Sequence, residues 1–282
     1  MQNLLKSALF SLSFCSISLA QEAIDDSSAP VVDQALIAYP KAKAAGETGS
    51  LNGIATIKVT ENHYFLNGSD TNALIMSWGN LSSSYAGAIV HKDLGYVITF
   101  EFEDTGYIKD EDKDDLDADE LMESFEDNQE LANEECLRQG LTTSTLSWSH
   151  KPEYLSDTNR VVWGLFVNSS DNTTSVNHEI RLLGRKGVMS ATIICDPSQV
   201  EAIIPVVDNM LEGYAYNDGE KYAQFEEGDK ISEYGLKGLI IGGGVFAAAK
   251  LGIFALLAKS WKWIVGGIVA VGAGIKKFFV KS

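Results

Sequence analysis

Several signatures of catalysis and cofactor binding are missing from this sequence. It has no G-x-S-x-G motif, no H-E-x-x-H motif, no C-x-x-C pair and no phosphate-binding glycine loop. Those patterns hold nucleophiles, zinc ligands, redox thiols or phosphate-binding amides at fixed spacings. The 4 histidines and 3 cysteines among 282 residues are scattered and show no metal-ligand spacing. The sequence therefore predicts no catalytic residue and no cofactor.

Basic residues are scarce over most of the chain, and acidic residues are absent from its end. All 39 Asp and Glu lie between Glu22 and Glu233, against 14 Lys and Arg in the same stretch. Seven lysines and no acid follow Tyr234. An acidic domain repels a phosphate backbone, whereas a basic tail is attracted to anionic lipid headgroups. We expect no nucleic-acid partner and predict membrane lipid as the partner of the tail.

The first 20 residues have the composition of a secretory signal peptide. Lys6 precedes an apolar run, and the small residues Ser18 and Ala20 precede Gln21. We expect cleavage after Ala20, and a short uncleaved anchor is the alternative. Residues 21–53 are expected to be loosely ordered, so that a single exported domain spans residues 54–235.

Two cysteines, Cys136 and Cys195, remain in the chain after such cleavage. An even pair in an oxidising compartment can form a disulfide, and these two residues are the predicted candidates. Two buried thiols that pack as small apolar residues are the alternative. Sequence alone leaves both open, because it does not bring the two Cα atoms within bonding reach.

The C-terminal part of the chain is strongly apolar. Gly238–Ala258, interrupted only by Lys250, has the length of a membrane-spanning helix, so residues 236–258 are predicted to cross a bilayer. Residues 259–282 hold a second apolar run, Trp263–Ile275, between lysines. This run either crosses back or lies along the inner leaflet. The predicted location is a bacterial membrane, most simply the inner one, with the acidic domain outside the cytoplasm.

The middle of the chain alternates between strand and helix signals. Apolar residues at every second position predict strands at 54–60, 96–103, 161–167, 178–183 and 188–194. Turn residues separate the last three at 168–174 and 184–187. One helix is predicted from Asp117 to Gly140, and another begins at Asp196, before Pro197. This order predicts an α+β fold, an antiparallel sheet with two main helices.

An acidic stretch at residues 110–120 comes near to the pattern of a metal site. Asp110, Asp112 and Asp114 fit the first, third and fifth positions of a calcium-binding loop. However, Asp115 stands where that loop needs glycine, and Leu121 where it needs glutamate. We therefore interpret the stretch as an acidic turn that leads into a helix, and the three aspartates are the metal candidates if a cation is held here.

Short segments over roughly residues 54–280 carry a resemblance to known proteins. They are Asp104–Asp110, Asp117–Leu121, Ala132–Glu135, Trp148 with Pro152 and Tyr154, Arg160–Trp163, Leu183–Arg185, Gly187–Ser190, Tyr222 with Phe225, and Glu233–Leu236. In this order they resemble the bacterial membrane-anchored family catalogued as domain of unknown function 2167. The resemblance implies an envelope protein with a C-terminal anchor, and it implies no activity or site residues. Cys136 and Cys195 depart from the family pattern, so a disulfide would be particular to this chain.

These observations favour a non-enzymatic binding or adaptor module of the bacterial envelope, facing the periplasm. Such a module would hold a ligand or another envelope or membrane protein. An enzyme of unrecognised type is one alternative, with Arg185, Asp104, Lys109 and Tyr107 as polar residues near turns. A structural subunit of a membrane complex is another. A pocket with convergent polar groups would favour binding or catalysis over a purely structural role.

Overall fold

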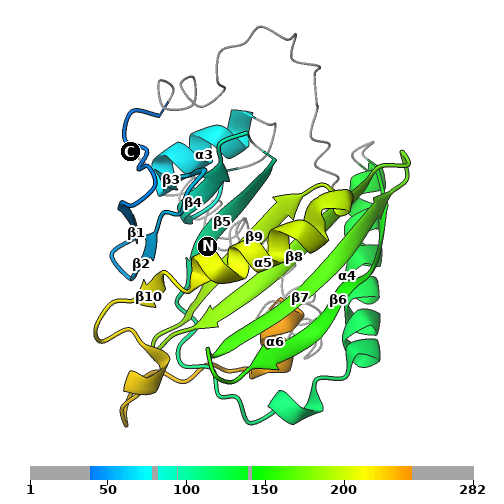
Figure 1. The fold of residues 1–282 in the computed structure, drawn as a ribbon. Helices are drawn as coiled ribbons and strands as arrows, with labels where there is room; N and C mark the ends of the chain where they lie inside the picture. The colour runs from blue at the N-terminus through cyan, green and yellow to red at the C-terminus, as the bar shows by residue number, and fades with distance from the viewer. Residues whose placement is uncertain (1–38, 78–81, 94, 139–141, 243–282) are drawn as a thin grey trace, which may run out of the picture.

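A seven-stranded antiparallel sheet forms the body of the protein (Figure 1). The structure is a computed structural model that describes residues 39–77, 82–93, 95–138 and 142–242. Within these residues the strand order is β3-β4-β5-β9-β8-β7-β6. The strands are β3 His63–Asn67, β4 Tyr85–His91, β5 Tyr96–Glu103, β6 Ser144–Leu155, β7 Arg160–Ser169, β8 Thr174–Leu183 and β9 Val188–Cys195. Two meanders therefore meet where β5 pairs with β9.

A smaller sheet brings the early and late parts of the domain together. Its order is β1-β2-β10, with β1 Thr48–Leu51, β2 Ala55–Lys58 and β10 Tyr214–Tyr216. Leu51 of β1 is fully buried. The folded domain thus begins before residue 54, where the sequence suggested its start, and residues 48–51 are an ordered strand. The predicted signal peptide lies outside the described residues.

The central strands β5, β8 and β9 alternate between two faces of the large sheet, because successive side chains of a strand point in opposite directions. What we call the apolar face carries residues that are at most 1 % exposed, namely Ile98, Phe100, Ile180, Ala191 and Ile193. What we call the polar face carries Thr99, Glu101, Glu103, Glu179, Arg181, Ser190 and Thr192. The same three strands thus present two chemically different surfaces.

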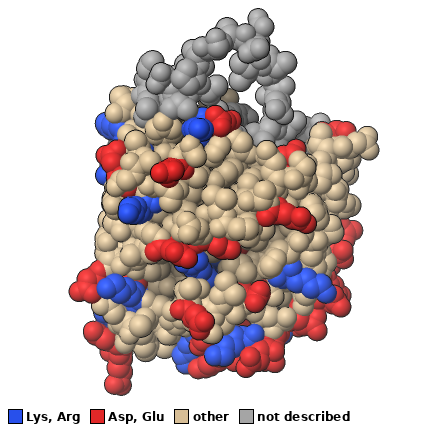
Figure 2. All heavy atoms as spheres, in the orientation of Figure 1, with Lys and Arg blue, Asp and Glu red and all other residues tan. Residues whose placement is uncertain are grey.

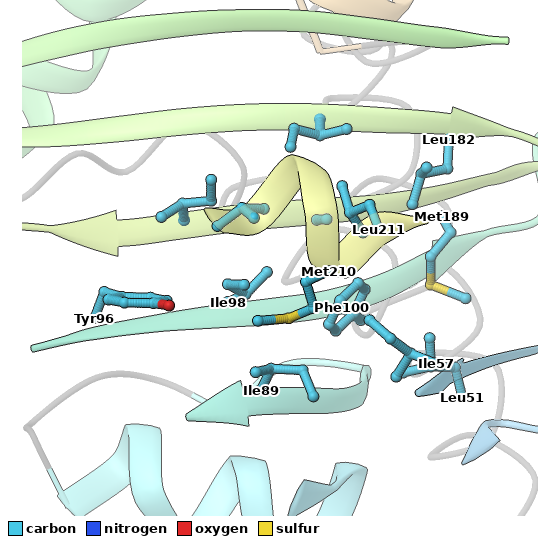
Figure 3. Packing of buried hydrophobic residues seen from close by; sticks show 14 of the residues in the cluster. Leu51, Ile57, Ile89, Tyr96, Ile98, Phe100, Leu182, Met189, Met210 and Leu211 are labelled. Atoms are coloured by element: carbon cyan, nitrogen blue, oxygen red, sulfur yellow. The ribbon is translucent and has the colours of Figure 1, made fainter. Parts of the chain in front are cut away.

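Helix α5, Val200–Leu211, lies over the apolar face (Figure 1). It follows the 3-10 turn η2, Pro197–Gln199, where the Asp196 side chain accepts a hydrogen bond from the Ser198 amide at 2.8 Å. The predicted helix start at Asp196-Pro197 is therefore confirmed. Met210 and Leu211 of α5 pack in one cluster with Phe100 (Figure 3). Each such fully buried side chain stabilises the fold by about 1.5–3 kcal/mol.

Helix α4, Ala118–Arg138, packs on the opposite face, toward the β6 edge. Asp117 caps it, because its carboxylate accepts hydrogen bonds from the amides of Asp119 and Glu120 at 2.9 and 3.1 Å. Its Leu121 and Phe125 are buried in a cluster with β7 residues. The interpretation of the acidic stretch as a helix start is confirmed at this residue.

Helix α3, Gly68–Ser77, covers the β3 edge of the same face and was not predicted from the sequence. It buries Leu74 against residues of β3, β4 and β5. Two further 3-10 turns, η1 Lys113–Asp115 and η3 Tyr222–Gln224, lie in the connections. The α+β fold with antiparallel sheets and few helices is confirmed.

A short helix, α6 Leu236–Ile240, forms the start of the apolar C-terminal part. Leu236, Leu239 and Ile240 are buried in the same cluster as α4 and β7. The helix ends there, and Gly242 has a φ of 103°, a left-handed conformation that glycine adopts without strain. The predicted helix over 236–258 is thus not continuous through Gly242, and the rest of it lies outside the described residues. None of the helices within the described ranges combines the length and apolar character that a membrane span needs.

Candidate functional site

A pocket of about 320 Å³ lies where β7 begins and β8 ends, beside β10. This volume falls at the lower end of the range for small-molecule sites. Its wall includes Arg160, Lys221 and three tyrosines, Tyr214, Tyr216 and Tyr222. Leu182, Leu183, Ala215 and Ala223 add apolar surface. Arg160 and Lys221 are the charged residues of this wall, which holds no carboxylate. We refer to this site as the tyrosine pocket.

Arg160 is the first residue of β7 and is partly buried. Its Nη2 donates a hydrogen bond to the carbonyl oxygen of Leu211 at 3.0 Å. Its Nε is buried and has no hydrogen-bond partner among the described residues. Burial lowers the pKa of Arg160, and the nearby Asp208 and Glu212 oppose that shift. The guanidinium still stays charged, because arginine does not deprotonate in proteins.

Tyr216 is held rigidly in the pocket wall. Its hydroxyl donates to the Leu182 carbonyl at 2.6 Å and accepts from the Met189 amide at 2.9 Å. These two bonds join β10 to β8 and β9. Gly184 makes room for the ring, since a Cβ there would lie 2.7 Å from the Tyr216 ring. The position and orientation of Tyr216 are therefore fixed by backbone groups.

Tyr214 lies two residues earlier on β10, so both rings leave the strand on the same side. The rings are 5.3 Å apart at 84°. The Tyr214 hydroxyl is buried and makes no hydrogen bond of normal geometry to the described residues. Burial raises the pKa of Tyr214, so it stays neutral and can act as a donor. Tyr216 and Arg160 are the polar groups that act on this hydroxyl.

Tyr222 completes the wall from η3. Its hydroxyl donates to the Ile108 carbonyl at 2.8 Å, and its ring stacks on Tyr107 with centroids 4.4 Å apart. Tyr107 in turn lies 4.3 Å from Phe225, centroid to centroid. Of the four polar residues that the sequence singled out near turns, Tyr107 is thus the one that backs the pocket.

The other three of those residues have structural partners. Arg185 forms a bidentate ion pair with Asp229 at 2.7 and 2.9 Å, which joins the β8–β9 turn to the loop that follows η3. Asp104 lies 3.7 Å from Lys230 Nζ, and Lys109 lies 3.2 Å from Glu111 on the surface. Exposed pairs of this kind contribute little to stability. None of the three lines the tyrosine pocket.

The polar face holds a second concentration of charge. Arg181 lies 3.5 Å from Glu179 and 3.7 Å from Glu103, and its guanidinium is 5.3 Å from the centre of the Trp163 ring. Glu179 also accepts a hydrogen bond from Thr192 at 3.0 Å, and Ser83 donates one to Glu101. Burial raises the pKa of Glu101 and of Glu179. Here the chain supplies its own counter-charges.

The three aspartates that partly fit a calcium loop have separate local roles. The Asp112 carboxylate caps α6, accepting from the amides of Leu236 and Lys237, both at 3.0 Å. Asp110 pairs with Lys113 at 3.6 Å, and Asp114 belongs to the exposed turn η1. Within the described ranges no group of three or more His, Cys, Asp or Glu is arranged to hold a metal.

The histidines fall into two pairs that the sequence did not reveal. The rings of His63 and His91 are 5.3 Å apart, and His63 Nε2 lies 2.5 Å from the Tyr96 hydroxyl. His150 and His178 face each other at 5.6 Å across Gly164, and burial lowers the pKa of His178 to about 4. Both pairs lie within the sheet, away from the pocket wall.

Cys195 is a buried free thiol at the end of β9, and burial raises its pKa to about 11. Such a thiol is unreactive at neutral pH. The side chain of Cys136 lies outside the described residues. The predicted disulfide between them stays a prediction.

A family profile described as "Protein of unknown function (DUF2167)" matches residues 43–273. The protein belongs to the DUF2167 family. No curated protein shows significant similarity to it. Among solved structures it is similar to the solution structure of cyanobacterial PsbP (CyanoP) from Synechocystis sp. PCC 6803, with a TM-score of 0.34 and 8% identity over 63% of this chain and 92% of that chain.

Some of the segments that carry the DUF2167 resemblance meet near the pocket. Backbone hydrogen bonds join Gly106 to Lys186 at 3.0 Å and Arg185 to Glu220 at 2.8 Å, and a β-bridge joins Gly184 to Lys221. The matching segment at residues 160–163 begins with the pocket arginine. The sequence missed this site because its members lie on four separate segments. The Tyr-x-Tyr pattern at residues 214–216 was its clearest local signal.

Proposed function

We propose that this DUF2167 protein is a ligand-binding module of the bacterial envelope, whose tyrosine pocket holds a small molecule. The C-terminal apolar part would keep the module at a membrane, and the acidic domain would face the periplasm. The role is binding or presentation, in keeping with the lack of a catalytic motif in the sequence.

The observation that carries the proposal is the pocket itself. Arg160 and Lys221 bring two cationic groups, and the wall brings no carboxylate, to a cavity lined largely by tyrosine and leucine. An apolar pocket with a few convergent polar groups is the usual form of a small-molecule site.

Filling the pocket tests the binding role. Ala223 is exposed in η3 and lines the pocket, so Ala223→Trp should occupy it without disturbing the core. Ala45→Trp, at an exposed residue outside the wall, is the matched control. We expect a ligand-observed NMR screen of the full chain in neutral detergent to find small molecules that bind wild type and the control. Hits that bind Ala223→Trp equally well would exclude this pocket as the site.

The proposed location rests on the apolar composition of residues 238–258 and on the lysines that follow. Alkaline phosphatase, which is active only outside the cytoplasm, would be fused after Gly242. We expect activity, and an inactive fusion at normal abundance would contradict an exported domain. A second fusion after Ser282 then distinguishes one membrane crossing from two.

A further inference from the structure

We propose that the tyrosine pocket recognises a small molecule with an apolar body and one anionic group, a carboxylate or a phosphate. This inference rests on the proposed binding function and names the class of ligand. The anionic group would lie against Arg160, and the apolar body would lie between the tyrosine rings and Leu182.

The partners of the arginines point to this ligand. Arg181 and Arg185 each have two carboxylates within 4 Å, Glu103 with Glu179 and Asp229 with Glu226. Arg160 is also partly buried, yet no carboxylate of the described residues lies within ion-pair distance of it. A desolvated charge is costly unless it is paired. Asp208 and Glu212 act on Arg160 only from beyond that distance, so direct pairing of its guanidinium is left to a ligand.

The charge of the surroundings strengthens the argument. Acidic side chains are spread over the surface of the domain (Figure 2). The pocket wall nevertheless carries Arg160 and Lys221 and no acid. Lys221 has one exposed partner, Asp218, at 3.5 Å, which leaves its ammonium free to approach a ligand. A positively charged recess in an acidic domain selects anions over cations and neutral molecules.

The wall also explains why the ligand should have an apolar body. The rings of Tyr216 and Tyr222 are held in place by hydrogen bonds of their hydroxyls to backbone groups. Rigid rings bury ligand surface at little cost in conformational entropy. A bare inorganic anion would use Arg160 and leave this surface unoccupied.

Four matched aromatic probes test the inference on the full chain in neutral detergent by isothermal titration calorimetry. They are benzoate, phenyl phosphate, neutral benzamide and cationic benzylamine. We expect both anions to bind at least about tenfold tighter than benzamide, since a hydrogen bond to a charged group contributes about 1.5–3 kcal/mol. We expect benzylamine not to bind. Dihexanoyl phosphatidylglycerol distinguishes a lipid headgroup, if it binds tighter than phenyl phosphate, from a free metabolite.

Two variants test whether the anionic probes bind in the tyrosine pocket. Arg160→Gln should lower the affinity for both anions about tenfold and that for benzamide less than twofold. Lys221→Gln changes an exposed residue and should lower the affinity for both anions about threefold. It provides the test of the pocket if Arg160→Gln fails to fold. Lys151→Gln removes the same charge from an exposed residue outside the wall and should change nothing.

The outcomes separate the two proposals. If benzamide binds as tightly as benzoate, the anion inference is wrong, and the pocket remains a binding site. If the anions bind and Arg160→Gln and Lys221→Gln have no effect, the inference is also wrong, because the anions then bind elsewhere. If no probe binds at 10 mM, the inference is overturned, and the screen with the filled pocket decides separately on the binding function.

Discussion

Arg181 on the polar face and Arg160 in the tyrosine pocket are both largely removed from solvent, and their surroundings differ. Arg181, whose side chain is 13 % exposed, is paired with two glutamates and lies over Trp163. Arg160 donates a hydrogen bond to the carbonyl of Leu211, and Asp208 and Glu212 act on it only from beyond ion-pair distance. Arg181 is thus ion-paired, although its Nε makes no hydrogen bond, whereas Arg160 has no ion pair among the described residues. A cluster of charges that pair with one another is a poor indicator of a functional site. A charge without an ion pair is a better one.

Of the substitutions considered, Arg181→Met should lower the free energy of unfolding the most. It leaves Glu103 and Glu179 without their cation in a region of low exposure. Removing one partner of a buried pair costs about 3–5 kcal/mol, and we expect the free energy of unfolding to fall by about 3 kcal/mol, since Glu103 is partly exposed. Urea denaturation followed by tryptophan fluorescence measures it, with Lys151→Met as the control. A loss below 1 kcal/mol would show that the network is not a stabilising one.

The next effect concerns the rigid wall of the pocket. Tyr216→Phe removes both hydrogen bonds of the buried hydroxyl and leaves the Leu182 carbonyl and the Met189 amide unpaired. We expect a loss of about 2 kcal/mol in the same denaturation experiment. Tyr222→Phe removes one bond, to the Ile108 carbonyl, and should cost about half as much. Equal losses would contradict the assignment of Tyr216 as the more firmly held ring.

The polar face should also make stability depend on pH. Burial raises the pKa of Glu179 above its ordinary value, so the folded state binds a proton more tightly than the unfolded state. That contribution is present at low pH and is lost as pH rises through the raised pKa. Glu179→Gln keeps an oxygen for Thr192 and removes the titration. We expect the variant to gain stability over wild type at pH 7.5 and to lose that gain at pH 4. A difference independent of pH would contradict this account.

The smallest expected effect is that of Arg160→Met on stability. The substitution removes a partly buried charge that has no carboxylate partner, and one hydrogen bond to Leu211. The two contributions oppose each other, so we expect a change below about 1 kcal/mol. The same substitution at Arg181 should cost several times more. Equal costs would remove the distinction between the ion-paired Arg181 and the unpaired Arg160.

Local signals in the sequence predicted much of the framework. Asp117 and Asp196 cap the helices that they were expected to start, and β5 has the predicted bounds 96–103. The turn at 184–187 joins β8 to β9 as expected. These features depend on the conformational preferences of residues that are adjacent in the sequence, so a local pattern is enough to predict them. The α+β arrangement follows from their order.

The candidate site could not be predicted in the same way. Whether an arginine is paired depends on residues far along the chain, such as Asp229 for Arg185 and Leu211 for Arg160. Asp112 caps a helix that begins more than a hundred residues later, a role that no local pattern reveals. Helix α3 was missed because its apolar residues are few and its packing against β3 and β4 determines it. Long-range packing decided these features.

The capped helix α6 also determines how a mechanical load would enter the domain. A pull on the chain beyond Gly242 would act first on α6, whose Leu236 and Leu239 are buried and whose first amides are held by Asp112. Lys237 passes part of that force to α4 through its 3.0 Å ion pair with Glu120. A force applied at Gly242 would therefore be resisted by buried side chains, two backbone caps and one ion pair before it reached the sheet.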